Sequence, residues 1–463
     1  MIRQRTTIFN PTKTHDDIVQ NIDKSSFSIK PSTDKFLIEN KFTIPVSVSD
    51  PFGKYKRIES LRIQTTDDSF KEDTIFNYRF SSGVNIYVVP KTVESNEDRE
   101  EFYQEVEQLV SELLPIEVKK DNWIKVLNSL HFHDYLPREL NVDILRLGGS
   151  EELFKSKNYD LFYEAGTGVI LKQLGLAWPE INIGLNETIH KEIGLFLTDE
   201  ISSPEDIVLS GVRVIISVEQ DEENIFKTFF HVKPRHRYSQ QEINSHIVDN
   251  GLHPILRTTF HGVGLPQDID VKECNLYYYL SLNKSLIFDI YQSVPQGAEL
   301  VLNYGSKDLE LPEYKIDEWG NEILFEFSNA SAPHHIDFTL HSRYQLPNNE
   351  SEVTEVLNSL PRLFYGCNVK DDYLLDKSPF DTKLKYGGNY EPYFTNDTVF
   401  YHLNHDDQSK VLVHVPNGTS SFDRVNTIST IAVLFGTFIV LVQILRAVLK
   451  TKAKAVDVNK KTQ

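Results

Sequence analysis

Methionine, cysteine and basic residues are scarce in this chain of 463 residues, and each shortage excludes something. The single methionine is residue 1, so no methionine-rich binding surface is present. Lys and Arg number 48 against 67 Asp and Glu, which gives a formal net charge of −19. Because phosphate backbones are bound by basic grooves, this balance argues against a nucleic-acid partner.

Only two cysteines occur, Cys274 and Cys367, and their meaning depends on the cellular compartment. In a reducing compartment they are small buried residues that carry little information. In an oxidising compartment they are a candidate disulfide, which would close a loop of about 94 residues. The chain-entropy model gives such a bridge a stabilising effect of ~4 kcal/mol.

Common catalytic and cofactor motifs are also missing. The sequence has no H-E-x-x-H, G-x-S-x-G or P-loop pattern, and two remote cysteines cannot form a CxxC zinc site. The stretch AGTGVILKQLG (165–175) lacks the third glycine of a dinucleotide-binding loop and predicts a turn into a helix. Asp268 and Asp270 have the D-x-D spacing of some metal sites, but surface carboxylates are expected in an acidic chain. We therefore expect no cofactor and no metal ion.

The sequence does contain one long apolar segment near its C-terminus. Residues 425–445 carry no charge, and the run is long enough to cross a hydrocarbon core as a helix. Six cations and one acid, Asp457, follow it, whereas only Lys410 and Arg424 are cations within a comparable distance before it. The positive-inside bias therefore predicts a transmembrane helix over 426–449, a cytosolic basic tail over 450–463, and the large N-terminal part across the membrane.

Two further features agree with a lumenal N-terminal part. Lys460 and Lys461 occupy the fourth and third positions from the end, which matches the dilysine signal that retrieves membrane proteins of the endoplasmic reticulum (ER). Acceptor sequons of the form N-x-[ST] all precede the apolar segment. They lie at Asn186, Asn283, Asn329, Asn349, Asn396 and Asn417.

The N-terminus disagrees with this orientation, because residues 1–20 contain no apolar stretch of the kind found in a signal peptide. Two topologies therefore remain. Either the C-terminal helix itself drives translocation of the preceding chain, or the protein is tail-anchored with its bulk in the cytosol. The cation bias, the sequons and the dilysine signal favour the first, a single-pass ER membrane glycoprotein.

The part before the apolar segment divides near residue 225. Residues 1–225 mix strand patterns at 80–90 and 210–220 with an amphipathic helix near 94–115 that Asn96 would cap. The apolar stripe of this helix consists of Phe102, Val106, Leu109, Val110 and Leu113. Residues 226–420 contain short aromatic and β-branched runs separated by turn formers, with one helix near 351–364. The expected class is α+β: a mixed N-terminal region, a mainly antiparallel β-sandwich and one C-terminal transmembrane helix.

Polar and ionisable residues gather in PHHIDFTLHSRYQLP (333–347). As a strand, this stretch alternates polar residues with Ile336, Phe338, Leu340 and Tyr344. The polar row consists of His335, Asp337, His341 and Arg343. Neighbours in that row lie about 6 to 7 Å apart, too far to share an ion without ligands from another strand. The row is either a hydrogen-bonded face available to a partner, or a metal or acid–base site.

The apolar segment has a candidate packing face of its own. Ser429, Ala432, Gly436 and Gln443 fall on one side of the expected helix. Ala432 and Gly436 have the small-xxx-small spacing that permits close approach of two helices. The alternative is a helix that faces lipid on every side.

Four sequence blocks in this order, ahead of one span, resemble the PIG-X family, most closely its fungal members, the protease B non-derepressible proteins. The similarity extends from about residue 250 to 450. The blocks are GLHPILRTTF (251–260), CNLYYYLSLNKSLIFDIYQ (274–292), HIDFTLHSRYQLP (335–347) and VLVHVPNGTSSFDRVNTIST (411–430).

This resemblance implies a non-catalytic subunit of glycosylphosphatidylinositol (GPI) mannosyltransferase I in the ER membrane. That enzyme adds the first mannose of the GPI anchor from dolichol-phosphate-mannose, and the partner implied is its multi-span catalytic subunit. A single span agrees with a non-catalytic role, because one helix cannot form a cavity for a polyprenyl donor. Two other functions remain open: a general lumenal folding factor, and a lumenal enzyme that uses the polar row.

Overall fold

The computed structural model describes most of the chain. The described residues are 1–9, 18–30, 36–67, 82–126, 129–147, 158–177, 181–198, 205, 207–216, 226–262, 264–268, 270–328, 334–369, 393–395, 397–405, 410–418 and 421–460. Strands predominate among them, beside the α-helices α2 (Asn96–Leu113) and α4 (Phe422–Lys460). The expected α+β class with one C-terminal apolar helix is confirmed.

The first sheet has eleven strands in the order β14-β13-β12-β1-β4-β10-β9-β5-β6-β8-β7. Its neighbours pair antiparallel except β1 and β12, which run parallel. The strands are β1 (Ile2–Phe9), β4 (Phe36–Pro45), β5 (Ile58–Thr66), β6 (Gly83–Pro90), β7 (Ile124–Val126), β8 (Ser129–Asp134), β9 (Asn158–Glu164), β10 (Gly168–Ala177), β12 (Ile189–Thr198), β13 (Leu209–Ile216) and β14 (Lys227–Val232). Strands β2 (Val19–Ile22), β3 (Ser26–Ile29) and β11 (Asn182–Gly184) form a small sheet packed beside it.

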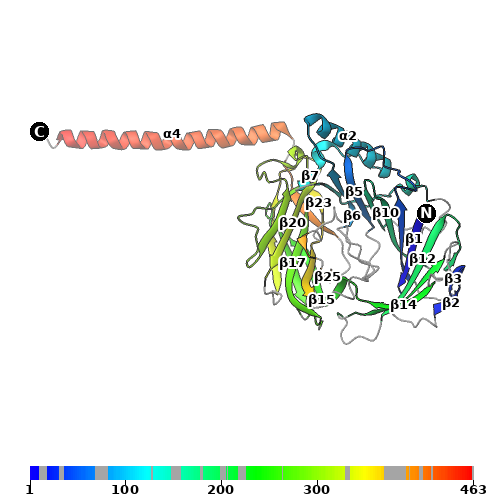
Figure 1. Ribbon diagram of the computed structural model, residues 1–463. Coiled ribbons are helices and arrows are strands. Elements are labelled where there is room, and N and C mark those ends of the chain that lie inside the picture. The colour runs from blue at the N-terminus through cyan, green and yellow to red at the C-terminus, as the bar shows by residue number, and fades with distance from the viewer. Residues whose placement is uncertain are drawn as a thin grey trace.

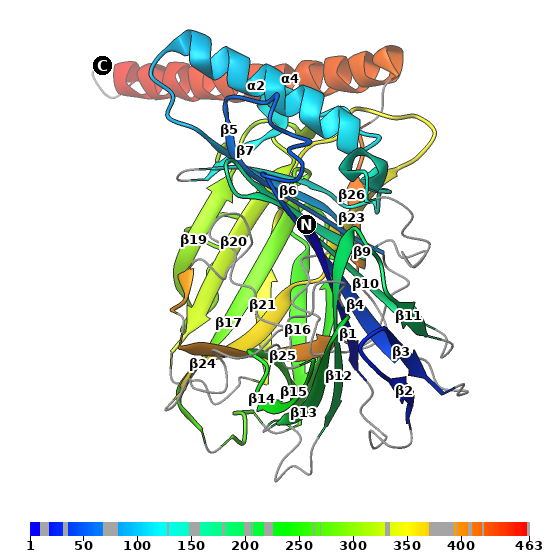
Figure 2. The ribbon, with the colours of Figure 1, turned by 45° about the vertical axis from the view of Figure 1, so that its right-hand side comes forward.

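Helix α2 covers the part of this sheet formed by β5 and β6 (Figure 2). Its buried residues are the five of the predicted stripe, Phe102, Val106, Leu109, Val110 and Leu113. They pack on strand residues such as Ile63 and Ile86 because the stripe repeats with the helical period. The N-cap is Ser95 and not the predicted Asn96. The Ser95 hydroxyl oxygen accepts from the Asp98 backbone N–H at 3.0 Å, and the Asp98 carboxylate accepts from the Ser95 backbone N–H at 3.1 Å.

The second sheet has eight strands in the order β19-β20-β17-β24-β25-β15-β16-β21, antiparallel except for β15 with β25. Its strands are β15 (His236–Val248), β16 (Ile255–His261), β17 (Val271–Asn283), β19 (Glu299–Gly305), β20 (Gly320–Phe327), β21 (His335–Thr339), β24 (Arg362–Val369) and β25 (Thr398–His405). A two-stranded ribbon of β23 (Val353–Ser359) and β26 (Lys410–Pro416) packs against one face of this sheet. Its residues Val356, Val413 and Val415 join the hydrophobic core of the sheet. The pair β18 (Leu286–Ile287) and β22 (His341–Ser342) adds Leu286 to the same core.

Two of the expected helices are strands. Residues 351–364 form β23 and the start of β24, with burial alternating along β23 up to Asn358 and Pro361 between the strands. Residues 165–175 form the turn and second strand of the β9–β10 hairpin. In that turn Gly166 and Gly168 have φ of 78° and 129°, which side chains with a Cβ disfavour. Short apolar runs of this kind are ambiguous between helix and strand, and tertiary pairing decided both.

The two large sheets lie side by side (Figures 1 and 2) and meet through a buried polar joint. His131 of β8 and Glu322 of β20 are buried, with Nδ1 and Oε2 2.8 Å apart. The Tyr279 hydroxyl donates to the other Glu322 oxygen at 3.1 Å, and the Trp319 indole N–H donates to the His131 carbonyl at 3.0 Å. Tyr87 stacks on the His131 ring at 4.1 Å. The joint therefore ties the first sheet to the second.

We expect Glu322→Ala to destabilise the protein by roughly 3 kcal/mol, because it leaves buried His131 and Tyr279 groups without their partner. Thermal unfolding of the purified protein measures the effect. Glu355→Ala is the matched control, since Glu355 is exposed on β23 and its loss should change stability by less than about 0.5 kcal/mol. Equal melting temperatures for the two variants would contradict the importance of the joint.

Candidate functional site

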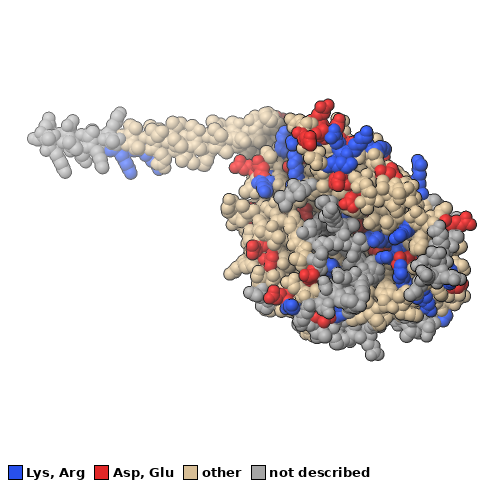
Figure 3. Space-filling model, in the orientation of Figure 1, with Lys and Arg blue, Asp and Glu red and all other residues tan. Residues whose placement is uncertain are grey.

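Helix α4 projects away from the β-rich part of the molecule (Figure 1). Its stretch Phe422–Lys450, 29 residues, is long and apolar enough to cross a membrane, and none of it is buried against the fold. At 1.5 Å per residue this stretch is about 43 Å long, longer than a hydrocarbon core of ~30 Å. No charged residue lies between Arg424 and Arg446, so this part of the helix has an uncharged surface (Figure 3). Its length and composition suggest a membrane anchor.

The predicted packing face of α4 has no neighbour among the described residues. Ser429, Ala432, Gly436 and Gln443 are all exposed. A Cβ added at Gly436 would meet nothing within 4 Å, so the small-residue face is open to another helix. Its role in docking stays a prediction. Lys460 ends α4 with its side chain outside the described part, and Lys461 lies outside it altogether.

The connection between the ribbon and α4 is held close to the fold. The Thr354 hydroxyl donates to the Asn417 side chain at 2.7 Å, and the Asn417 N–H donates to the Glu352 carbonyl at 2.8 Å. The Asn348 N–H donates to the Gly418 carbonyl at 2.9 Å. The chain is therefore fixed to the β-rich part until four residues before α4 begins.

The polar row of residues 335–343 is only partly formed. His335 and Asp337 lie on the outer face of β21, where Arg257 of β16 donates two hydrogen bonds to Asp337 at 2.7 and 2.8 Å. The charge and donors of Arg257 outweigh burial and lower the pKa of Asp337. His341 packs edge-on against His253 at 4.7 Å, and burial with that neighbour lowers the pKa of His341. The three polar side chains thus have protein neighbours.

Arg343 does not belong to the row, which corrects the sequence-based prediction. The strand breaks at Leu340, so the alternation of polar and apolar faces does not continue beyond it. Arg343 is 2% exposed and Tyr344 is 67% exposed, whereas the alternation predicts Arg343 on the polar face and Tyr344 on the apolar face. The buried guanidinium donates to the Leu311 carbonyl at 2.8 Å and to the Ser306 hydroxyl at 3.3 Å. Arg343 therefore joins its own segment to the loop after β19.

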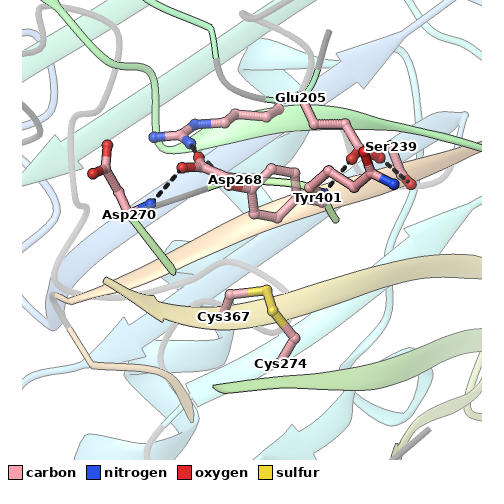
Figure 4. The surroundings of a disulfide bond; sticks show 9 residues. Glu205, Ser239, Asp268, Asp270, Cys274, Cys367 and Tyr401 are labelled. Atoms are coloured by element: carbon pink, nitrogen blue, oxygen red, sulfur yellow. Dashed lines mark hydrogen bonds and ion pairs between the residues drawn. A yellow bond between two sulfur atoms is a disulfide. The ribbon is translucent and has the colours of Figure 1, made fainter. Parts of the chain in front are cut away.

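The D-x-D pair belongs to a cluster of ion pairs in which Asp268 is buried and Asp270 is partly exposed. Asp268 pairs with Arg237 and accepts from the Tyr401 hydroxyl at 2.6 Å and from the Asp270 backbone N–H at 2.8 Å (Figure 4). The Asp270 carboxylate pairs with Lys233. Burial alone would raise the pKa of Asp268, but the Tyr401 hydroxyl and the Arg237 charge outweigh it and hold the pKa below its usual range. No group of three or more His, Cys, Asp or Glu in the described part of the chain is placed to hold a metal ion.

Glu205 supplies a neighbouring set of hydrogen bonds. Its carboxylate accepts from the Ser239 hydroxyl and the Gln240 N–H, both at 2.9 Å, and from the Gln267 N–H at 2.6 Å. Sequence reasoning missed Glu205 and Arg237, because one acid or one arginine in a charged chain carries no signal of burial.

Cys274 and Cys367 face each other on the paired strands β17 and β24. The structure joins them in a disulfide, which lies apart from the carboxylates of Glu205, Asp268 and Asp270 (Figure 4). The antiparallel register places the two residues directly opposite each other, with their Cα atoms 4.1 Å apart. The bridge is therefore compatible with the oxidising-compartment hypothesis.

The sequons differ in how the fold engages them. The Asn186 oxygen accepts from the Thr188 N–H at 2.9 Å in an exposed turn, and Asn349 is exposed. The Asn283 side-chain N–H donates to the Leu357 carbonyl at 3.2 Å. Asn417 is held by Thr354 as described above. Asn329 and Asn396 lie outside the described residues.

Comparisons with known proteins give a consistent result. A family model described as PIG-X / PBN1 matches residues 249–445. The chain is 46% identical to Protein PBN1 of Candida albicans, over 98% of this chain and 99% of that protein. It is 41% identical to Protein PBN1 of Debaryomyces hansenii, over 98% of this chain and 99% of that protein. It is 30% identical to Protein PBN1 of Saccharomyces cerevisiae, over 63% of this chain and 67% of that protein. The match to a solved structure titled BspA_C_mut covers 89% of this chain and 98% of that structure's chain, with 8% identity. Its TM-score of 0.16 is too low to inform the fold.

We expect Asp268→Asn to destabilise the protein by about 3 kcal/mol, because it leaves the buried Arg237 charge uncompensated. Since the folded pKa of Asp268 lies below the unfolded value of ~3.9, its stabilising effect is present above that pH. The effect is lost as the pH falls through the folded pKa, so the variant should lose stability least at low pH. Thermal melts across the acid range measure both effects.

Asp270→Asn is the control for that experiment, because Asp270 is more exposed and its pair should contribute at most about 1 kcal/mol. Added Mg²⁺ or Mn²⁺ should leave the melting temperature of the native protein unchanged. A rise with the cation that both substitutions abolish would instead support the metal hypothesis.

Proposed function

This chain belongs to the PIG-X/PBN1 family, and from that premise we propose that it is a non-catalytic, stabilising subunit of GPI mannosyltransferase I. The observation that carries the proposal is the match to PBN1 proteins over nearly the whole chain. The family is connected with GPI-anchor biosynthesis, and the finer assignment names the complex that adds the first mannose. The multi-span catalytic subunit is the proposed partner.

A single apolar helix with an open small-residue face supports this role. In a bilayer, apolar surface alone does not drive helices together, so close packing and polar contacts decide association. Ala432 and Gly436 allow a neighbouring backbone to approach, and Gln443 offers donors and an acceptor on the same side. Binding of a multi-span subunit there would hold it in its folded state by mass action, because a partner that binds only the native form stabilises it.

We further propose that the β-rich part is lumenal and that the tail is cytosolic. The cations that follow the apolar stretch, the dilysine at Lys460 and Lys461, and the position of the sequons support this orientation. The Cys274–Cys367 disulfide fits the same compartment, because such bonds persist in oxidising environments such as the ER lumen.

Sequon occupancy tests the orientation. We expect endoglycosidase treatment to increase the mobility of the protein, and we expect Asn186→Gln and Asn349→Gln each to remove part of that shift. Asn283→Gln should leave it unchanged, because its amide nitrogen is bonded to the Leu357 carbonyl. Gel mobility with and without the enzyme is the measurement. A protein with no glycan at any sequon would support the tail-anchored cytosolic topology.

Depletion and rescue test the proposed function. Depleting this protein should lower the abundance of the catalytic subunit and the mannosylation of GPI precursors, and the native chain should restore both. Ala432→Leu with Gly436→Leu should fail to restore them, because added side chains weaken association by about tenfold, or about 1.4 kcal/mol.

Thr430→Leu with Thr437→Leu is the matched control, since it adds bulk on another face of α4. An unchanged catalytic subunit after depletion would contradict the proposal. Widespread misfolding of unrelated lumenal proteins, with GPI products no more affected than the rest, would favour the general folding factor instead.

A further inference from the structure

We propose that the β-rich part makes its own contact with the lipid headgroup region of the membrane that α4 crosses. The contact surface, here called the juxtamembrane patch, comprises the exposed side chains of Leu309, Leu311, Tyr314, Tyr344 and Leu346. The proposal requires α4 to be a membrane anchor and goes beyond the proposed function, because it assigns a lipid-binding surface outside the helix.

Arg343 builds the patch by joining its two segments. Its buried guanidinium donates to the Leu311 carbonyl at 2.8 Å and to the Ser306 hydroxyl at 3.3 Å. The Glu313 N–H donates to the Tyr344 carbonyl at 3.0 Å, which sets the loop after β19 beside residues 343–346. Side chains from two segments that are 30 or more residues apart in sequence thus form one surface.

The loop of the patch is ordered from within. The Asp308 carboxylate accepts from the backbone N–H groups of Glu310 at 2.8 Å and Leu311 at 3.1 Å. The 3₁₀ turn η3 (Glu313–Lys315) follows, and Lys284 pairs with Glu313 at 2.7 Å. The apolar side chains are therefore presented by a fixed backbone, so binding needs little ordering of the loop.

Covalent continuity places the patch at the membrane. Asn348, two residues after Leu346, is hydrogen-bonded to Gly418, and α4 begins four residues later at Phe422. Four residues span at most about 14 Å even when fully extended. Tyr344 and Leu346 precede Asn348 by four and two residues, and Asn348 is bonded to Gly418, four residues before α4. The headgroup region is therefore within reach of the patch.

The chemistry of the patch suits a lipid interface. Leu346 is 61% and Tyr344 is 67% exposed, and clustered apolar side chains on a surface mark a contact. Tyrosine is enriched at headgroup level, because its ring is apolar and its hydroxyl remains hydrated. The cations Lys307 and Lys315 are outnumbered in their loop, whose acids are Asp308, Glu310, Glu313, Asp317 and Glu318, so no excess of positive charge attracts anionic lipid. Attachment should therefore be apolar in origin and independent of anionic lipid.

Fluorescence quenching in vesicles tests the proposal. The full chain is reconstituted alone into phosphatidylcholine vesicles, with Tyr344→Cys or Leu346→Cys labelled by an environment-sensitive fluorophore. The native chain, whose two cysteines are paired, should take up no label. Phe229→Cys is the matched control, because Phe229 is 66% exposed on β14, away from the α4 end of the molecule (Figure 1).

We expect brominated lipids to quench emission at positions 344 and 346 and to leave position 229 unchanged. Adding phosphatidylserine to the vesicles should not increase the quenching. In the 346 variant, Arg343→Lys should reduce quenching while the protein stays in the vesicles, because lysine cannot reproduce the two contacts of the guanidinium with Leu311 and Ser306.

Emission at both patch positions that responds only to a water-soluble quencher would overturn the proposal. Protection that appears only after the multi-span subunit is added would also overturn it, since the patch would then be a protein contact. The rescue result for the α4 variants is independent of either outcome, so failure of this inference can be told from failure of the proposed function.

Discussion

Burial of the Glu322 carboxylate between the two large sheets constrains the whole β-rich part of the chain. A buried polar group is tolerated only when hydrogen bonds replace its hydration, and His131 and Tyr279 provide the partners of the Glu322 carboxyl group. The eight-stranded sheet has buried apolar residues on both faces. One face contributes to the core shared with the β23–β26 ribbon, and the other carries Tyr279, Leu324, Phe364 and Phe400.

Two-sided burial explains what the sequence did and did not predict about the fold. Strand β17 was recognised from NLYYYLSL, but this run has no simple alternation because residues Tyr278–Leu282 are all buried. Helix α2 was predicted down to its five buried residues, since one face is solvated and the 3.6-residue period is clear. Residues 351–364 were assigned to a helix because a short apolar run does not reveal that β26, over 50 residues away, pairs with it.

The candidate site shows the same limit on a smaller scale. His335 and Asp337 lie on the predicted outer face of β21, because alternation holds within a regular strand. It fails beyond Leu340, where the chain turns to pair with β18 and Arg343 is drawn into a buried position between loops. No local pattern marks that change. Likewise Asp268 looked like a surface acid, and only the fold brings Arg237 and Tyr401 to it.

These partners also bear on where the protein can act. The conspicuous carboxylates and histidines of the sequence are largely engaged: Asp268 by Arg237, Asp337 by Arg257, and His131 by Glu322. Groups bound in this way stabilise the contacts between strands and loops. Large apolar surface remains exposed at the end where α4 leaves the fold, on α4 itself and on Tyr344 and Leu346. Because exposed apolar surface is what a membrane or a membrane partner recognises, this distribution fits interaction at the bilayer.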